Sequence, residues 1–397
     1  MMTIFTGKVM RMKKKLQKLK VKLSQRDMIV IVAVSAVIVV ALGVFGFLRS
    51  DFHNAYSDGE NGSESLFSSI VSSDGKGVTF TGNDIITVKS FSGRMFVLTE
   101  KLLASVDSDG EIKYTKVHNY KNPAIEVSDR YGILFNRNSH EYMIFTTKGI
   151  IGEGASDEEN DIIAAGINNE GAFALSTKSD SSASKVYLHT KKGEKKYIWA
   201  CGEEYAVTME VHSSSKKIAV GAIGASGGEI LSKSYLLDIY SDTAKCDFSL
   251  EGEGITDIKY TGKNIISIFP GKRVLYDVKA AKGAPQKSEF TSTAVATYTD
   301  GSGNTAVITD GIGGFDKTSL TVYTGKNQVK YTIELDGKPS DVVLKGRSAF
   351  VLCGNTLYEA AGGKLKNTST LDFSADGLVI SKGKIFAYSS GFLKEVG

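Results

Sequence analysis

Apolar residues are arranged in two patterns along this chain. One continuous run, MIVIVAVSAVIVVALGVFGFL, occupies residues 28–48 without a charge. From residue 78 onward, apolar runs of five to eight residues alternate with turns rich in Gly, Asp, Asn and Ser-Lys. This second part shows no sustained 3.6-residue periodicity of the kind that predicts amphipathic helices, so it is predicted to form many short strands.

The run at residues 28–48 has the length of a transmembrane helix. At about 1.5 Å rise per residue, a helix of this length spans roughly 30 Å, the thickness of the hydrocarbon core of a bilayer. Nine Lys or Arg residues precede the run, and only Arg49 directly follows it. The positive-inside rule therefore predicts a cytoplasmic N-terminus and an extracytoplasmic C-terminal part. Because the apolar run is longer than a usual signal-peptide core, an uncleaved signal anchor is favoured over a cleaved signal peptide.

The residues on either side of this run differ in character. Residues 1–27 form a basic tail in which Val9, Met12, Leu16, Leu19 and Leu23 are spaced for one face of a helix. The tail is interpreted as an amphipathic helix on the anionic inner leaflet, as a short coiled-coil seam, or as a simple topology-setting flank. The lysines assigned to the membrane surface are Lys13, Lys14, Lys15, Lys18, Lys20 and Lys22. Residues 49–77 are rich in Ser, Gly, Asp and Asn and are predicted to be a flexible linker.

The pattern from residue 78 to residue 397 repeats about every 40 residues. Each repeat contains two apolar strands and then a hairpin with a Gly-Lys or Lys-Gly turn, as in VYLHTKKGEKKYIW from Val186. The predicted repeats begin near Ile85, Ala124, Asp161, Ala206, Ile255, Thr293, Asp341 and Gly377. Four strands in each repeat are typical of a β-propeller blade, because a single sheet cannot bury both of its faces and must stack on neighbouring sheets.

The fold class is therefore predicted to be all-β, a propeller behind an N-terminal transmembrane helix. The last repeat has only three strands, and the segment Val78–Phe80 could supply the fourth and close the ring. This count gives eight blades, with seven blades or a pair of β-sandwiches as alternatives. Inner strands should be continuous apolar runs such as NIISIF, and outer strands should carry Lys, as in EKKYIW.

The strand–Gly-Lys-turn–strand unit resembles the repeats of pyrroloquinoline-quinone-type propellers. Such repeats occur in quinoprotein dehydrogenases and in the envelope lipoprotein that assists outer-membrane barrel assembly. That repeat usually ends in a docking Trp, whereas here Trp199 alone has this position and Phe248, Phe290 and Ile333 replace it elsewhere. The layout of basic tail, anchor and propeller also resembles an uncharacterised family of bacterial single-pass membrane proteins.

Composition and charge support this picture. The chain has 42 Gly and 4 Pro in 397 residues, which suits strands joined by tight turns. Without the nine bases and one acid of residues 1–48, the totals of 48 basic and 44 acidic residues become 39 and 43. The acidic C-terminal part gives no reason to expect nucleic-acid binding. Cys201, Cys246 and Cys353 lack CxxC spacing and are interpreted as buried free thiols, although one disulfide is possible.

The sequence contains no complete catalytic or metal-binding motif. Gly224–Gly228 lacks the spacing of a hydrolase elbow, and the five His residues lack zinc-ligand spacing, although His118 and His140 could converge in a ring. The loops from Asp107 and from Asp300 resemble the start of a calcium loop but fit hairpin turns better. Cofactors and metals are therefore not expected.

Three functions are consistent with these features. The favoured hypothesis is a non-catalytic interaction scaffold outside the cytoplasm, with the bilayer and an envelope protein as partners and no small-molecule cofactor. The second is a hydrolase or lyase whose site assembles in the central channel, where distant residues converge. The third is a ligand sensor coupled to the basic tail, although the flexible linker argues against tight coupling.

Overall fold

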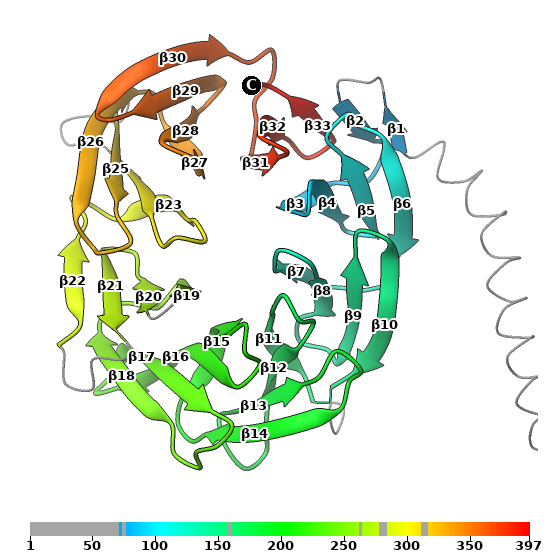
Figure 1. Cartoon of the computed structure of the whole chain (residues 1–397), viewed down its shortest axis with the longest axis vertical. Coiled ribbons are helices and arrows are strands. Elements are labelled where there is room, and N and C mark those ends of the chain that lie inside the picture. The colour runs from blue at the N-terminus through cyan, green and yellow to red at the C-terminus, as the bar shows by residue number, and fades with distance from the viewer. Residues whose placement is uncertain (1–70, 74–76, 157–159, 262–263, 278–283, 311–316) are drawn as a thin grey trace, which may run out of the picture. The chain divides into compact units, whose positions relative to one another are not determined.

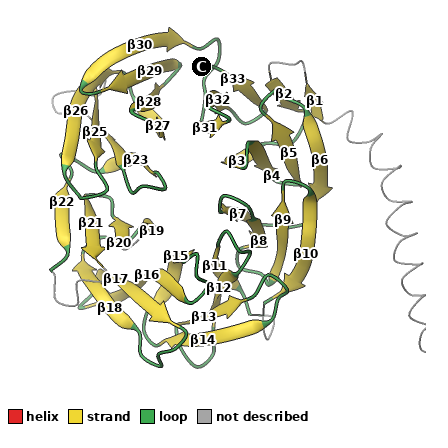
Figure 2. Cartoon of the chain, viewed as in Figure 1, coloured by secondary structure: helices red, strands yellow, loops and turns green. Residues whose placement is uncertain are grey.

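The computed structural model describes residues 71–73, 77–156, 160–261, 264–277, 284–310 and 317–397. The chain divides into two units, Met1–Ser69 and Ile70–Gly397, and all the described residues belong to the second. The described residues contain strands and turns (Figure 2), and none of them forms a helix that could cross a membrane. The basic tail, the apolar run at 28–48 and the linker up to residue 70 lie outside the described residues.

Eight antiparallel sheets are arranged around one axis (Figure 1). The strands of the first four blades are β3 (Ile85–Phe91), β4 (Arg94–Thr99), β5 (Leu102–Asp107), β6 (Ile112–Val117); β7 (Pro123–Val127), β8 (Gly132–Asn136), β9 (Glu141–Thr146), β10 (Gly149–Ala155); β11 (Ile162–Ile167), β12 (Phe173–Lys178), β13 (Ser184–His189), β14 (Lys195–Cys201); β15 (Tyr205–Val211), β16 (Lys217–Ser226), β17 (Glu229–Asp238), β18 (Lys245–Glu251).

The second half of the ring repeats this arrangement. Its strands are β19 (Asp257–Thr261), β20 (Asn264–Ile268), β21 (Lys272–Asp277), β22 (Gln286–Glu289); β23 (Ala294–Thr299), β24 (Thr305–Asp310), β25 (Lys317–Tyr323), β26 (Val329–Asp336); β27 (Pro339–Lys345), β28 (Ser348–Cys353), β29 (Thr356–Ala361), β30 (Lys364–Thr370); and β31 (Gly377–Ser381), β32 (Lys384–Tyr388), β33 (Phe392–Glu395) with β1 (Val71–Ser73) and β2 (Gly77–Phe80).

The fold is thus an eight-bladed propeller of four-stranded blades, which confirms the predicted class and blade number. The alternatives of seven blades and of two β-sandwiches are wrong. Every blade begins within two residues of its predicted start, because the turn residues between apolar runs mark the repeats clearly. The first strand of each blade lies next to the axis and the fourth lies at the outside (Figure 1).

The ring closes through its eighth blade, which combines both ends of the described chain. Its strand order is β1-β2-β33-β32-β31, with Val78 paired to Leu393 and Thr79 paired to Phe392. This confirms the predicted closure by the segment around Val78–Phe80. An additional strand, β1, pairs with β2 and covers its outer edge. It lies within the predicted linker 49–77, so the strands of the ring begin at Val71.

Burial differs from strand to strand within a blade. The second strands are buried on both faces, as in β8, where all five residues are buried, and in β20, which contains the NIISI run. The fourth strands are exposed, as in β30, where six of the seven residues are exposed. The first strands are of mixed burial, since one of their faces lines the axis of the ring and can therefore carry polar residues.

Aromatic side chains on fourth strands, or just after them, pack against the next blade. The ring centroid of Trp199 lies 4.9 Å from that of Tyr235. Phe248 contacts Phe269 at 5.8 Å, and Phe290 contacts Tyr323 at 5.9 Å. The positions at which the sequence replaces Trp by Phe therefore keep an inter-blade contact, and aromatic burial supplies the packing that a Trp would give.

Candidate functional site at the mouth of the central channel

The strongest candidate site is a cavity on the axis of the ring. It has a volume of about 440 Å³ and is lined by residues from the ends of the first strands and the turns that follow them. Six blades contribute, through β3, β7, β11, β15, β19 and β23 (Figure 1). We call this cavity the channel mouth. Because every blade places the turn after its first strand on the same face of the ring, residues up to about 210 positions apart in sequence meet there.

A charged cluster around Lys259 forms part of the channel mouth. The Nζ atom of Lys259 on β19 lies 3.5 Å from Oε2 of Glu210 on β15 and 3.9 Å from Oδ1 of Asp257. Charges on Asp257, Glu210 and Glu126 raise the pKa of Lys259, so the ammonium is held in its charged form. We call these four residues the charged cluster: Glu126 on β7, Glu210 on β15, and Asp257 and Lys259 on β19.

Glu210 experiences opposing influences within this cluster. Burial raises the pKa of its carboxyl, Lys259 lowers it, and the neighbouring charges of Asp257 and Glu126 raise it again, with a net increase. About a third of the Glu210 side chain is exposed, as is about a third of Lys259. The cluster therefore combines protein-enclosed charges with access to the solvent in the cavity.

The rim of the channel mouth is held by hydrogen bonds between blades. The backbone N–H of Asp129 donates to Oδ1 of Asn169 at 2.7 Å, and Nδ2 of Asn169 donates to Oδ2 of Asp129 at 2.7 Å. Nδ2 of Asn168 donates to the carbonyl oxygen of His212 at 2.8 Å. These bonds connect the second, third and fourth blades, so the polar groups of the rim have defined positions relative to one another.

Aromatic rings form part of the lining. The ring centroids of His212 and Tyr260 are 4.4 Å apart, and the Nδ1 atom of His212 lies 2.8 Å from Oγ of Ser214. Burial lowers the pKa of His212, and the charge of Lys217 lowers it further, so the imidazole is neutral at neutral pH. Tyr298, on β23 of the blade next to that of Tyr260, also lines the cavity.

The two loops that resemble the start of a calcium loop in sequence are hairpin turns in the structure. Oδ1 of Asp300 accepts hydrogen bonds from the N–H groups of Ser302 and Asn304 at 2.8 and 2.9 Å. Oδ1 of Asp107 accepts from the N–H groups of Asp109 and Glu111 at 2.9 and 3.0 Å. Both are Asx-type turns, as predicted, in which the carboxylate accepts hydrogen bonds from backbone N–H groups. Gly224–Gly228 belongs to the β16–β17 hairpin, which was also predicted.

The histidines and cysteines singled out in the sequence lie elsewhere. His118 is buried after β6, where its Nδ1 accepts from the N–H of Tyr120, and Nε2 of His140 lies 4.0 Å from Oε1 of Glu141. Neither of the two is among the residues that line the channel mouth. Cys201 and Cys353 are buried free thiols, as interpreted, and the side chain of Cys246 lies outside the described residues. Burial raises the pKa of Cys201 to about 12, aided by Glu204, which makes it unreactive.

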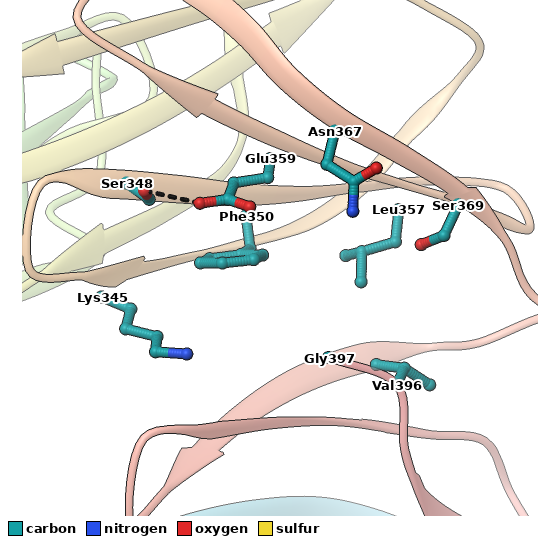
Figure 3. A pocket seen from close by; sticks show the side chains of 9 residues that line it. All are labelled: Lys345, Ser348, Phe350, Leu357, Glu359, Asn367, Ser369, Val396 and Gly397. Carbon is teal, nitrogen blue, oxygen red and sulfur yellow. Dashed lines mark hydrogen bonds between the residues drawn. The ribbon is translucent and has the colours of Figure 1, made fainter.

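A second cavity, of about 280 Å³, lies between the seventh and eighth blades. Figure 3 shows Phe350 and Leu357 facing the segment that carries Val396 and Gly397. Oγ of Ser348 donates to Oε1 of Glu359 at 2.8 Å, and the Lys345 ammonium lies 5.6 Å from the centroid of Phe350. Its charged groups are thus already in contact with their neighbours, and the channel mouth is the better candidate.

The charged cluster was not identified from the sequence. All four residues of the charged cluster belong to first strands, where charges interrupt the apolar pattern, singly as in PAIEV or as a pair as in DIKYT. These charges within the first strands were the signal in the sequence that could have indicated a polar site. Among the described residues, no group of three or more His, Cys, Asp or Glu could hold a metal ion. The arrangement is suited to binding charged or hydrogen-bonding groups.

Comparisons with known proteins give the fold and the family. The BamB structure from Moraxella catarrhalis has a TM-score of 0.50 at 12% identity, covering 78% of this chain and 92% of that one. Apo AztD from Citrobacter koseri has a TM-score of 0.52 at 10% identity, covering 77% and 94%. The C-terminal WD40 domain of Sif2 has a TM-score of 0.56 at 11% identity, covering 83% and 99%.

At these identities the similarity concerns the propeller fold alone. The search of curated proteins found no match. A family model described as a family of unknown function, DUF5711, matches residues 71–384. The match covers the ring from β1 to the start of β32. The pyrroloquinoline-quinone-type character of the repeats stays a prediction.

Proposed function

We propose that this chain, which belongs to the DUF5711 family, is a membrane-anchored, non-catalytic scaffold. Its propeller binds a protein partner outside the cytoplasm. The observation that supports it best is the channel mouth. Six blades present polar groups there, and inter-blade hydrogen bonds fix those of the second, third and fourth blades. A rigid surface of this kind binds without losing much conformational entropy, which favours recognition.

The chemistry of the described side chains also supports binding over catalysis. The two described thiols are buried, and burial raises the pKa of each of them, so neither is an activated nucleophile. Lys259 is held as a cation by three carboxylates, whereas a catalytic lysine base needs a lowered pKa. The rim hydroxyls and amides contribute hydrogen-bonding groups, which suit recognition of a polar partner.

The anchoring part of the proposal rests on the sequence. Residues 28–48 are long enough to span a bilayer, and nine basic residues precede them. We propose residues 1–27 as the cytoplasmic tail, with Lys13, Lys14 and Lys15 among the lysines at the membrane surface, and residues 49–70 as the linker to the ring. Protease treatment of intact cells should remove the ring and leave the tail protected. A ring that resists protease until the cells are lysed would contradict this topology.

Site-specific photo-crosslinking in intact cells tests the scaffold. A photoreactive residue at Ser213, an exposed residue that lines the channel mouth, should give a discrete adduct with one protein. The same residue at Ser181, an exposed turn position outside the lining of the cavity, is the matched control and should give none. If positions around the rim produce no adduct while the protein is correctly folded and exported, the scaffold proposal fails.

An enzyme is the second candidate, favoured by one observation. Glu210 has a raised pKa and lies in a cavity beside Lys259, as a general acid of a hydrolase or lyase could. Activity of the purified protein on envelope glycans or peptides that is abolished by Glu210→Gln, with folding unchanged, would support this candidate. The scaffold proposal requires that Glu210→Gln alter binding alone.

A further inference from the structure

We propose that the channel mouth binds a basic segment of the partner protein and takes the side-chain cation of a lysine or arginine. This inference rests on the proposed scaffold function and names the chemistry of the partner. It is carried by the excess of negative charge in the cavity, by the ammonium that the protein itself places there, and by the aromatic rings in its wall.

The lining of the channel mouth carries an excess of negative charge. Asp129, Glu210 and Asp300 line the channel mouth with Lys259 as the single basic residue among the lining residues. The carboxylates of Asp257 and Glu126 act on Lys259 from adjacent positions of the charged cluster. The cavity lining and the charged cluster together thus contain five carboxylates and one ammonium. Such a cavity attracts cations and repels anions, and low-dielectric walls strengthen both effects.

The cavity already accommodates one ammonium group, that of Lys259. The Nζ atom of Lys259 reaches both Glu210 and Asp257 within 4 Å, at 3.5 and 3.9 Å. Only one oxygen of the Glu210 carboxylate is used in this contact. The charge of Glu126 also raises the pKa of Lys259, so three carboxylates interact with the same cation. One internal cation therefore leaves the carboxylates of the cluster incompletely neutralised, and a second cation would complete the neutralisation.

Aromatic rings form part of the cavity wall. Tyr260 and Tyr298 line the cavity from adjacent blades, and neutral His212 packs on Tyr260 at 4.4 Å. Aromatic faces attract ammonium and guanidinium groups with about 0.5–2 kcal/mol, and they also cover the apolar stem of a lysine or arginine. A side chain with a long apolar stem and a charged head fits a lining of this kind better than a compact metal ion does.

A direct binding measurement with the full-length protein tests this inference. Fluorescently labelled hexalysine is the probe, hexaglutamate is the matched control probe, and fluorescence anisotropy is the readout. Hexalysine should bind, its affinity should fall as salt is added, and hexaglutamate should not bind. Glu210→Gln should weaken hexalysine binding by about tenfold, the loss expected for one close charge pair.

Three further variants have different expected effects on hexalysine binding. Lys259→Gln removes the internal cation and should strengthen hexalysine binding, a result that a merely structural role for the cluster would not produce. Asp129→Asn changes an exposed residue of the rim and should weaken binding without affecting the fold, so it replaces Glu210→Gln if that variant unfolds. Asp372→Asn removes an exposed carboxylate that pairs with Lys394 outside the cavity and should have no effect.

Specific outcomes would overturn the inference. Equal hexalysine affinity in all variants, or weaker binding by Lys259→Gln, would show that the cluster does not recognise cations. Spermidine binding as tight as hexalysine would assign the cavity to a small amine and exclude a basic segment of a protein. A crosslinked partner at Ser213 that persists in Asp129→Asn and Glu210→Gln would overturn the cation assignment and leave the scaffold function intact.

Discussion

The hydroxyl of Ser232 donates a hydrogen bond of 2.7 Å to the carbonyl oxygen of Glu253, and it accepts one of 2.9 Å from the N–H of Ile255. Ser232 belongs to the third strand of the fourth blade, and its two partners belong to the connection leading to the fifth. Ser184 makes the same pair of bonds with Glu204 and Ala206 one blade earlier. A third-strand hydroxyl thus fixes the chain where it passes between blades.

Replacing this hydroxyl tests its contribution. Ser232→Ala should lower the free energy of unfolding by about 1–3 kcal/mol, because the buried N–H of Ile255 loses its partner and the carbonyl of Glu253 loses a donor. Urea unfolding followed by tryptophan fluorescence and circular dichroism measures the change. Ser213→Ala, at an exposed position, is the control and should change the free energy by less than about 0.5 kcal/mol.

Removal of the closing strand should open the ring. A chain that starts at Lys76 keeps β2 and loses β1, and it should stay folded, since the four-stranded blade is intact. A chain that starts at Thr81 also loses β2, which exposes the edge of β33 and uncovers the buried contacts of Val78 and Phe80. We expect the second chain to aggregate or unfold in size-exclusion chromatography and circular dichroism. Equal behaviour of the two chains would contradict the role of β2.

Arg273 is buried between the fifth and sixth blades with none of its surface exposed. Its Nε donates to Oγ1 of Thr305 at 3.0 Å, its Nη2 donates to the carbonyl oxygen of Gly303 at 2.8 Å, and its Nη1 donates to Asn327. Arg273→Ala should destabilise the protein by about 3 kcal/mol or more, because it leaves a cavity and unpaired acceptors.

The control for this variant is Arg347→Ala, at an exposed position of the seventh blade. Thermal unfolding should show a large decrease in Tm for Arg273→Ala and a change near zero for Arg347→Ala. A small effect at Arg273 would mean that the hydrogen bonds add little beyond the desolvation of the guanidinium.

Asp341 predicts a dependence of stability on pH. Its carboxylate accepts hydrogen bonds from the N–H groups of Leu378 at 2.7 Å and Val342 at 2.8 Å, but burial raises its pKa to about 6. The folded state therefore favours the protonated form, and the associated stability is present below about pH 4 and is lost as the pH rises through about 6. The maximal loss is on the order of 3 kcal/mol.

Asp341→Asn removes the ionisation while keeping an oxygen that can accept from Leu378. The difference in unfolding free energy between the two proteins should shift in favour of the variant between about pH 4 and pH 7. Urea titrations at several pH values in this interval measure it. A difference that does not depend on pH would show that Asp341 titrates in the folded protein as it does in the unfolded chain.

The sequence by itself determined the class of this protein, the number of its blades and the closure of the ring. These follow from local chemistry: turns rich in Gly, Asp and Asn interrupt apolar runs, and the three-stranded last repeat lacks a partner that Val78–Phe80 can supply. Strand length and pattern are visible along one chain, because the residues that decide them are neighbours in sequence.

Only the tertiary structure decided which residues meet at the axis. Glu126, Glu210 and Lys259 belong to three different blades, and the role of each charge depends on which residues face it across the ring. The sequence equally allowed His118 and His140 to converge, yet neither residue lines the channel mouth. Charges interact through distance in space, which the repeat pattern does not encode, so the candidate site emerged only when the blades were arranged around a common axis.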